Sequence, residues 1–236
     1  MTKNCELLNR IEWPCDLPEI ARTTLLQKAA IIQVNDTSEL QAKLPNNIIY
    51  VLSGVVISCM VTNGIRAVSG VVIGKGCWFG LINLGEIKTP YFQFEIVEPL
   101  VAVSLPEKHC QSLAEIYPQL YKWLWHVSLD ISSRWLQSQV MSGESIMTKL
   151  VYLLLDIAAH QGSTKAMSYP ITLSQYQFSN MTGISRSRLN HALKTLEQNN
   201  EILISRGHIT INNFEKLGQR LNDLDLSFRD PRTLIN

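Results

Sequence analysis

The hydrophobic residues of this chain repeat with two different periods. In the first half, β-branched and aromatic residues gather in short runs, which predict strands over 31–34, 48–52, 55–61, 65–73 and 92–103. Asn63 and Gly64 separate two of these runs, and this dipeptide is typical of a two-residue hairpin turn. Short strands at such spacing predict a small barrel or a jelly roll.

The helical period begins at Pro118, which suits the first turn of a helix. Apolar residues then recur every three to four positions, at Leu120, Leu124, Val127, Ile131 and Trp135. A stripe of this length can pack on the predicted strands or on a second copy of the same helix. Large contact areas are available to either surface from Trp123, Trp125 and Trp135. Residues 142–145 interrupt the pattern and predict a hinge, and a further helix is expected over 146–160.

Two short helices with a tight turn between them are predicted after residue 171. Ser174 can cap the first helix, and Gln177 three residues later can complete a capping box. Gly183 can take the left-handed conformation that ends this helix. Ser185 is the expected cap of the second helix, and residues 184 and 189 have the spacing of a hydrophobic staple. The angle between the two helices is therefore encoded locally.

The second helix has one apolar face and one polar face. The apolar stripe consists of Leu189, Ala192, Leu193 and Leu196. Polar residues occupy or flank the opposite face: Ser187, Arg188, Asn190, His191 and Lys194. Arg186 lies in the first turn, where the helix dipole disfavours a cation, so it indicates a partner rather than local stabilisation.

A hairpin is predicted directly after the second helix. Alternating isoleucines at 202, 204, 209 and 211 flank the turn sequence Arg206-Gly207-His208. In this position the hairpin would be a wing, with Arg206 and His208 at its tip.

Double-stranded DNA is the partner that these residue types fit. Arg can pair with guanine, His and Asn can bond to base edges, and Ser and Lys can hold phosphates. We expect the DNA-binding residues to be Ser185, Arg186, Ser187, Arg188, Asn190, His191, Lys194, Arg206 and His208. A polar helix face can also simply be solvated, or it can form a protein interface.

The segments 173–175, 178–186 and 193–197 resemble the winged helix-turn-helix of the cyclic-AMP receptor protein and fumarate-nitrate regulator superfamily. The resemblance implies a bacterial transcription regulator that dimerises through the helix 118–141, with RNA polymerase as a candidate partner. The family often has Glu after the first recognition-helix Arg, whereas this chain has Ser187, so a different preferred base sequence is expected.

The segments 50–56 and 74–80 resemble the cyclic-nucleotide-binding β-roll of the same superfamily. An effector pocket is accordingly expected around Trp78, Phe79, Leu81, Ile82, Lys88, Thr89 and Tyr91. In this family an Arg-Ser pair holds the cyclic phosphate and a carboxylate holds the ribose. This chain has Pro90 and Tyr91 at the first position and Leu81 at the second, with no Arg between Arg66 and Arg134. Because a buried phosphate needs a fixed cation, we do not expect cyclic AMP to bind. Two possibilities then remain for this pocket: it binds an unknown small-molecule effector, or it binds no effector.

Composition, cysteine and histidine spacing, and the absence of targeting patterns argue against several other classes of protein. Among the 236 residues, 46% are hydrophobic and 17% are charged, which excludes a disordered chain, and the net charge is only +1. Five cysteines without CxxC spacing favour reduced thiols over disulfides or a metal site. Some relatives in the family hold an iron-sulfur cluster with grouped N-terminal cysteines, but Cys5 and Cys15 are too few for one.

The five histidines form no catalytic motif, so no enzyme is expected. Neither a signal peptide nor a membrane span is evident, which favours a cytoplasmic protein.

Together these patterns predict an α+β protein with three parts. Residues 1–113 would form a β-roll (jelly-roll) sensor, residues 114–142 a dimerisation helix and hinge, and residues 143–236 a winged helix-turn-helix domain. The expected function is sequence-specific regulation of transcription. The alternative is a sensor of the same fold that acts through protein contacts without specific DNA binding.

Overall fold

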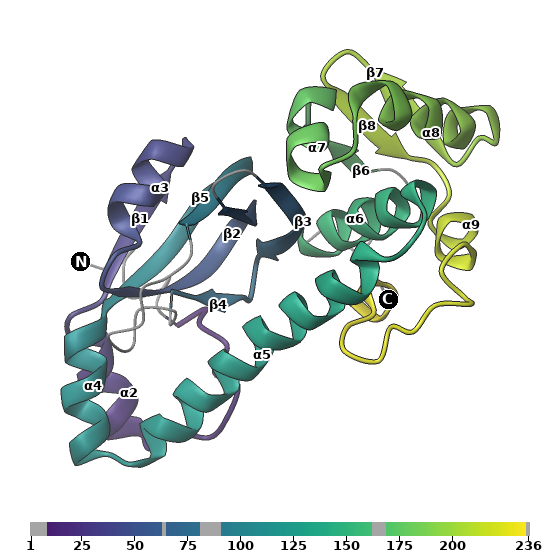
Figure 1. Ribbon diagram of the computed structural model, residues 1–236. Helices are drawn as coiled ribbons and strands as arrows, with labels where there is room; N and C mark the ends of the chain where they lie inside the picture. The colour runs from purple at the N-terminus through teal and green to yellow at the C-terminus, as the bar shows by residue number, and fades with distance from the viewer. Residues whose placement is uncertain (1–8, 63–64, 81–90, 162–168, 235–236) are drawn as a thin grey trace.

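A computed structural model describes residues 9–62, 65–80, 91–161 and 169–234 of the chain. Two lobes lie at the ends of the long helix α5 (Gln119–Ser142), as Figure 1 shows. The N-terminal lobe is built on a curved antiparallel sheet, and the C-terminal lobe contains a bundle of short helices with a small second sheet. The α+β class expected from the two hydrophobic periods is confirmed.

The N-terminal sheet has the strand order β1-β5-β2-β3, and β4 pairs with β2. Its strands are β1 (Ala30–Val34), β2 (Asn47–Thr62), β3 (Ile65–Gly74), β4 (Trp78–Phe79) and β5 (Tyr91–Pro106). The predicted strands 48–52 and 55–61 are wrong as separate elements, because both belong to β2. Register shifts around Ser53 and Val55 bend β2 there instead of ending it, and Gly54 takes a φ of 93°.

The predicted hairpin between the second and third strands is consistent with their register, in which Thr62 pairs with Ile65. The turn residues Asn63 and Gly64 themselves lie outside the described residues. Three short helices of this lobe were not expected from the sequence: α2 (Glu19–Leu26), α3 (Thr37–Lys43) and α4 (Glu107–Ile116).

Helix α5 has two apolar stripes, of which the sequence pattern revealed one. Leu120, Leu124 and Val127 pack into the core of the N-terminal lobe, and Ile131 and Trp135 pack against the side chains inside the sheet. The opposite side of α5 exposes a second stripe to solvent, formed by Tyr121, Trp125, Leu129, Leu136 and Val140. The predicted stripe therefore joins the helix to its own sheet, and a different face is available to a partner.

The hinge expected at 142–145 connects α5 to α6 (Ile146–His160). Gly143 closes α5, and the Ser145 hydroxyl accepts a hydrogen bond from the amide of Thr148 at 3.2 Å, which caps α6. Because α5 ends and α6 begins within three residues, the direction of the chain can change here.

The C-terminal lobe contains a three-stranded sheet and the two predicted short helices. The helices are α7 (Gln175–Thr182) and α8 (Arg186–Gln198), and the strand order is β6 (Tyr169–Ile171), β8 (His208–Ile211), β7 (Ile202–Ser205). Strand β6 was not predicted from the sequence, and residues 162–168 lie outside the described part. The final α-helix of the described residues is α9 (Phe214–Gln219).

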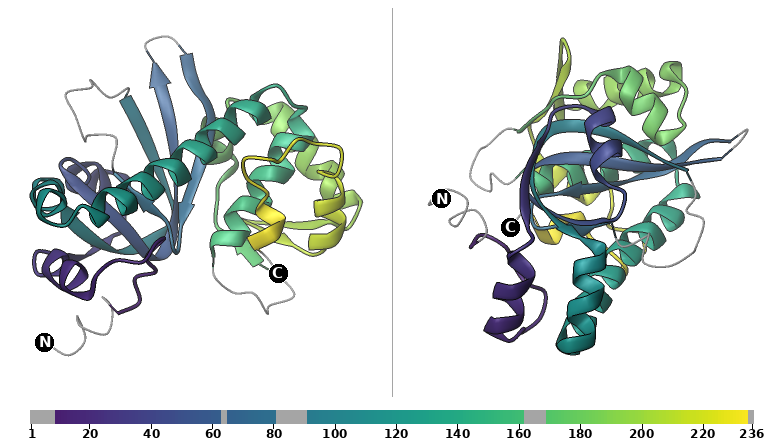
Figure 2. Two further views of the ribbon diagram at one scale, coloured as in Figure 1. Left: turned by 90° about the horizontal axis from the view of Figure 1, so that it is seen from below. Right: turned by 90° about the vertical axis from the view of Figure 1, so that its left-hand side faces the viewer.

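After α9 the chain runs back toward α5 and ends in a 3-10 turn, Pro231–Leu234, against α6 (Figure 2). Gln137 of α5 is fully buried and holds this tail with both ends of its amide. It donates to the carbonyl of Asp225 at 2.9 Å and accepts from the amide of Arg229 at 3.2 Å. Within the described residues, no helix is both long and apolar enough to cross a membrane.

Candidate functional site

The turn between α7 and α8 has the geometry that the sequence predicts. Ser174 Oγ accepts from the amide of Gln177 at 3.2 Å, and Gln177 Oε1 accepts from the amide of Ser174 at 3.0 Å, which completes the capping box. Gly183 ends α7 with a φ of 65°. The Ser185 backbone is extended at the start of α8, but its side chain makes no capping hydrogen bond, so the predicted side-chain cap is wrong.

Helix α8 is held by its apolar face and presents its polar face to solvent. Leu189, Leu193 and Leu196 are fully buried in a cluster with α6 and the small sheet. Exposed side chains on the other face are Ser185, Arg186, Ser187, Arg188, His191 and Lys194. Asn190 is half-buried. The structure thus brings six of the nine predicted DNA-binding residues onto one open surface.

A contact across the turn involves a residue that the sequence analysis did not single out. The guanidinium carbon of Arg186 lies 4.7 Å from the ring centroid of Tyr176, which is itself exposed. A cation over an aromatic face is attracted by the ring quadrupole. The sequence alone contained one signal for this contact, an aromatic residue in the first turn of the first short helix.

The predicted wing is confirmed as the hairpin of β7 and β8, in which Ser205 pairs with His208. Arg206 and Gly207 form its tip, where Gly207 takes a φ of 84°. Arg206 is exposed and His208 is half-buried. The wing is tied to the end of α8, because Glu197 Oε1 accepts from the amide of Ile204 at 2.9 Å.

Of the residues expected to line an effector pocket, Trp78 and Phe79 are the two whose side chains the structure describes. Trp78 and Phe79 are both buried, but as neighbours on β4 they enter two different clusters. Trp78 packs with Trp13, Tyr50 and Trp123, whereas Phe79 lies among apolar side chains of the sheet. The remaining positions, 81, 82, 88 and 89, lie outside the described residues, and the side chain of Tyr91 is not described.

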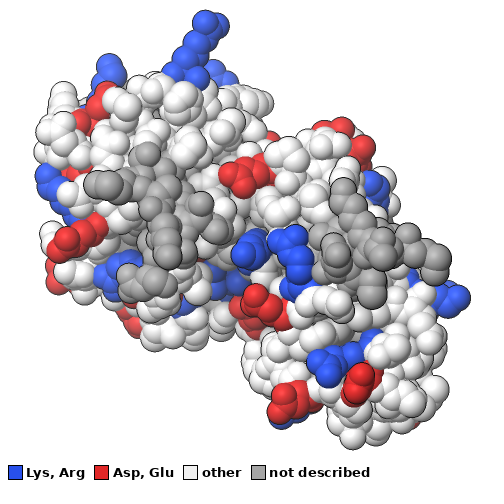
Figure 3. Space-filling view, turned by 180° about the vertical axis from the view of Figure 1, so that it is seen from behind, with Lys and Arg blue, Asp and Glu red and all other residues white. Residues whose placement is uncertain are grey.

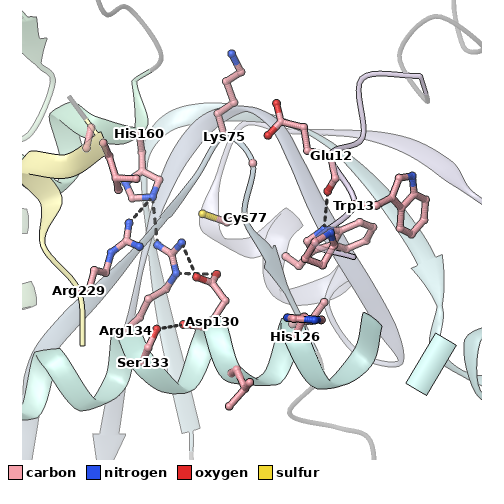
Figure 4. Close-up of a pocket in the computed structure, with 17 residues that line it drawn as sticks. Glu12, Trp13, Lys75, Cys77, His126, Asp130, Ser133, Arg134, His160 and Arg229 are labelled. Atoms are coloured by element: carbon pink, nitrogen blue, oxygen red, sulfur yellow. Dashed lines mark hydrogen bonds and ion pairs between the residues drawn. The ribbon is translucent and has the colours of Figure 1, made fainter. Parts of the chain in front are cut away.

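A polar cluster lies where the two lobes meet (Figure 4). Arg134 of α5 donates to Asp130 at 3.0 Å, to the carbonyl of Val72 at 3.0 Å and to His160 Nε2 at 3.2 Å. Arg229 of the tail donates to the same His160 nitrogen at 3.0 Å and to Asp156 at 3.2 Å. Lys and Arg side chains gather at this junction in Figure 3. The cluster ties the sheet, α5, α6 and the tail together.

His160 is the centre of this cluster. Its Nδ1 lies 2.7 Å from the carbonyl of Asp156. Guanidinium groups can only donate, so Nε2 accepts from Arg134 and Arg229, and Nδ1 carries the proton that is donated to Asp156. This arrangement holds while His160 is neutral. Burial favours the neutral form, but the negative charges of the Cys77 thiolate and Asp156 raise the pKa of His160.

Cys77 lies beside this cluster. Burial opposes its thiolate, but the charge of Arg134, the protonated form of His160 and the Gly74 amide outweigh burial and lower the pKa of Cys77 to about 7. Among the described residues, no group of three or more His, Cys, Asp and Glu side chains could hold a metal ion.

Comparison with known proteins identifies the domain and the fold. Residues 148–220 match the family model of the Crp-like helix-turn-helix domain. A transcriptional regulator of the crp/fnr family from Eubacterium rectale is 14% identical with a TM-score of 0.64, over 86% of this chain and 94% of that one. FixK2 from Bradyrhizobium japonicum is 14% identical with a TM-score of 0.59, over 81% and 96%. The c-di-GMP responsive regulator CLP from Xanthomonas campestris is 15% identical with a TM-score of 0.59, over 83% and 100%.

No curated protein matches the chain in sequence. Residues 148–220 are similar to the Crp-like helix-turn-helix domain, and the chain shares its fold with solved structures of crp/fnr regulators. The resemblance expected from the sequence is therefore confirmed.

Proposed function

We propose that this protein is a sequence-specific, DNA-binding regulator of transcription. The observation that carries the proposal is the exposed polar face of α8, which is held outward by a buried apolar face in a Crp-like helix-turn-helix domain. In such domains the second helix enters the major groove with its N-terminal residues toward the bases. Arg186, Ser187 and His191 would then meet base edges, and Lys194 and the wing residue Arg206 would contact phosphates.

The working unit would be a homodimer formed through α5. Trp125 and Leu129 are 64% and 48% exposed, and with the rest of the exposed stripe they form a continuous apolar face on a 24-residue helix. An apolar stripe of this kind is stabilised by pairing with a second helix. A dimer would also present two copies of α8 to half-sites one helical turn apart, about 34 Å.

The nucleotide pocket would be degenerate. The described interior of the sheet is filled by apolar side chains, including Phe79, Phe94 and Val71, and Trp135 of α5 covers it with its ring against Phe92. An apolar interior of this kind offers no partner to a cyclic phosphate. Cyclic AMP should leave the melting temperature unchanged, whereas a binding ligand would raise it in proportion to its excess. A saturable rise would contradict this part of the proposal.

The protein would regulate rather than catalyse, with RNA polymerase as a candidate partner on the promoter, and DNA binding would place it in a bacterial cytoplasm. The alternative function is a sensor of the same fold that acts through protein contacts alone. Exposed Arg186 and Arg188 could equally decorate a protein surface.

A gel shift at two salt concentrations distinguishes the two functions, because each phosphate contact makes the affinity depend on salt. We expect Arg186→Ala to weaken specific binding by about 1–3 kcal/mol while non-specific binding changes less. Lys194→Ala is the matched control: it should weaken binding to all sequences and lower the salt slope by about 1. Equal losses from Arg186→Ala on all sequences would argue against base readout.

A further inference from the structure

A cavity of about 730 Å³ lies at the junction of the lobes, between the N-terminal segment, the turn before β4, α5, α6 and the C-terminal tail. The indole rings of Trp13 and Trp78 line one wall, with ring centroids 5.4 Å apart. Arg134 and Arg229 line the opposite wall, and Cys77 lies between the two walls (Figure 4). The volume is that of a pocket for a small organic molecule.

The sulfur of Cys77 lies among groups that stabilise a thiolate. The amide of Gly74 donates to Sγ at 3.4 Å. Figure 4 shows the sulfur directed toward Arg134 and His160, which come from two different helices. Asp130, Asp156 and Arg229 face the same cluster and are paired within it, and Lys75 of the adjoining turn points away from it. Arg134 is the cation that does most to lower the pKa of Cys77.

The other described cysteines have different surroundings. Cys59 and Cys110 lie in apolar cores, and burial raises the pKa of each to about 12. Cys15 is more exposed than Cys77, but burial raises its pKa as well. A thiol reagent that reaches all four sites would therefore find its best nucleophile at Cys77, although Cys15 is easier to reach.

We propose that this cavity is a reaction site for small organic electrophiles of the enone class, with Cys77 as the nucleophile. The indole walls can stack a flat conjugated molecule, and the basic wall can stabilise negative charge on its oxygen. The thiol first loses its proton to water, and the thiolate then forms a bond to the β-carbon. The π electrons of the C=C bond move to the oxygen as an enolate, which takes a proton from water at the α-carbon.

An adduct on Cys77 would be transmitted to the DNA-binding domain, which is the step that rests on the proposed function. Gly74, at the start of the same turn, has no room for even a β-carbon, because one would collide with Cβ of His160. The sulfur of Cys77 is buried beside His160 and Arg134, so we expect a substituent on it to displace one of these two side chains. Since His160 ends α6, its displacement would release the hydrogen bonds that join α6 to Arg134 of α5 and to Arg229 of the tail.

N-ethylmaleimide, an enone-like reagent, tests the site on the full chain at pH 7 with mass spectrometry of each cysteine peptide. We expect Cys77 to react about 10-fold faster than Cys15, with a rate that rises around pH 7, whereas the rate at Cys15 should rise only at higher pH. Reaction at Cys15 first, or at Cys77 only in denaturant, would overturn the proposal.

The transmission step is tested by DNA affinity after labelling, with Cys77→Ser treated in the same way as the control. Labelling should change the DNA affinity of the wild-type protein by about 5-fold or more. The same treatment should leave the DNA affinity of the Cys77→Ser variant unchanged. Equal affinities before and after labelling of Cys77 would show that the adduct is not transmitted. If the unlabelled protein binds no DNA, the proposed function fails, but the labelling rates still decide the site.

Discussion

At the scale of single residues, Arg186 shows how local chemistry and tertiary contact combine. Its position in the first turn of α8 is unfavourable for a cation by itself, yet the exposed ring of Tyr176 lies under its guanidinium group. The stack limits the rotamers of a long side chain before any partner arrives. We infer that Tyr176 positions Arg186 for base contact, an arrangement that also rests on the proposed DNA-binding function.

Substitution of Tyr176 tests this positioning role. Tyr176→Ala should weaken specific DNA binding by about 0.5–1 kcal/mol, the value of an exposed cation–π contact. Tyr176→Phe is the matched control, because it keeps the ring and should bind as the wild type does. Affinities measured by fluorescence anisotropy would contradict the role if the Phe variant lost as much as the Ala variant, since the hydroxyl group would then be responsible.

The sequence was most informative where residues close along the chain determine the structure. The capping box of Ser174 and Gln177, the left-handed Gly183 and the turn at Gly207 all depend on neighbours within a few positions. The cluster around His160 could not be predicted, because it joins residues 72, 134, 156 and 229, which are far apart in the sequence. No local pattern marks such a contact.

At the scale of elements, α5 shows what a hydrophobic repeat in the sequence cannot decide, namely which surface the helix packs against. Its inner stripe was visible as a repeat, but the assignment of that stripe to a partner helix or to the sheet required the fold. The outer stripe was concealed in sequence because Trp125 and Leu129 are interspersed with buried residues. Similarly, the bulge near Gly54 made one bent strand look like two, because β-strand patterns are broken wherever the register shifts.

The proposed dimer is tested at the outer stripe of α5. Leu129→Glu should produce a monomer, because two carboxylates would face each other in an apolar interface. Ile116→Glu makes the same change at an exposed position of α4, which is 66% exposed, and should leave the dimer intact. Sedimentation velocity of both variants measures the result. A dimeric Leu129→Glu protein would show that α5 is not the interface, and a monomeric wild type would show that the dimer does not form.

At the scale of the whole molecule, the two lobes share a hydrophobic cluster as well as a polar one. Val55, Ile57 and Val72 on the outer face of the sheet pack with Leu150 and Leu154 of α6. The C-terminal lobe is thus fixed to the N-terminal lobe in this conformation, with α8 still open to solvent (Figure 1). The described contacts between the lobes include those of α6, α7 and the tail, so a rearrangement of the sheet would be felt at this joint.

The central claim is that the polar face of α8 reads a DNA sequence, and selection from randomised oligonucleotides tests it most directly. The wild-type protein should enrich a two-fold symmetric sequence whose half-sites lie about one helical turn apart. Arg186→Ala should enrich that sequence weakly or relax one position in each half-site. The claim is contradicted if the wild-type dimer, with and without cell extract to supply an effector, enriches no sequence above the starting pool.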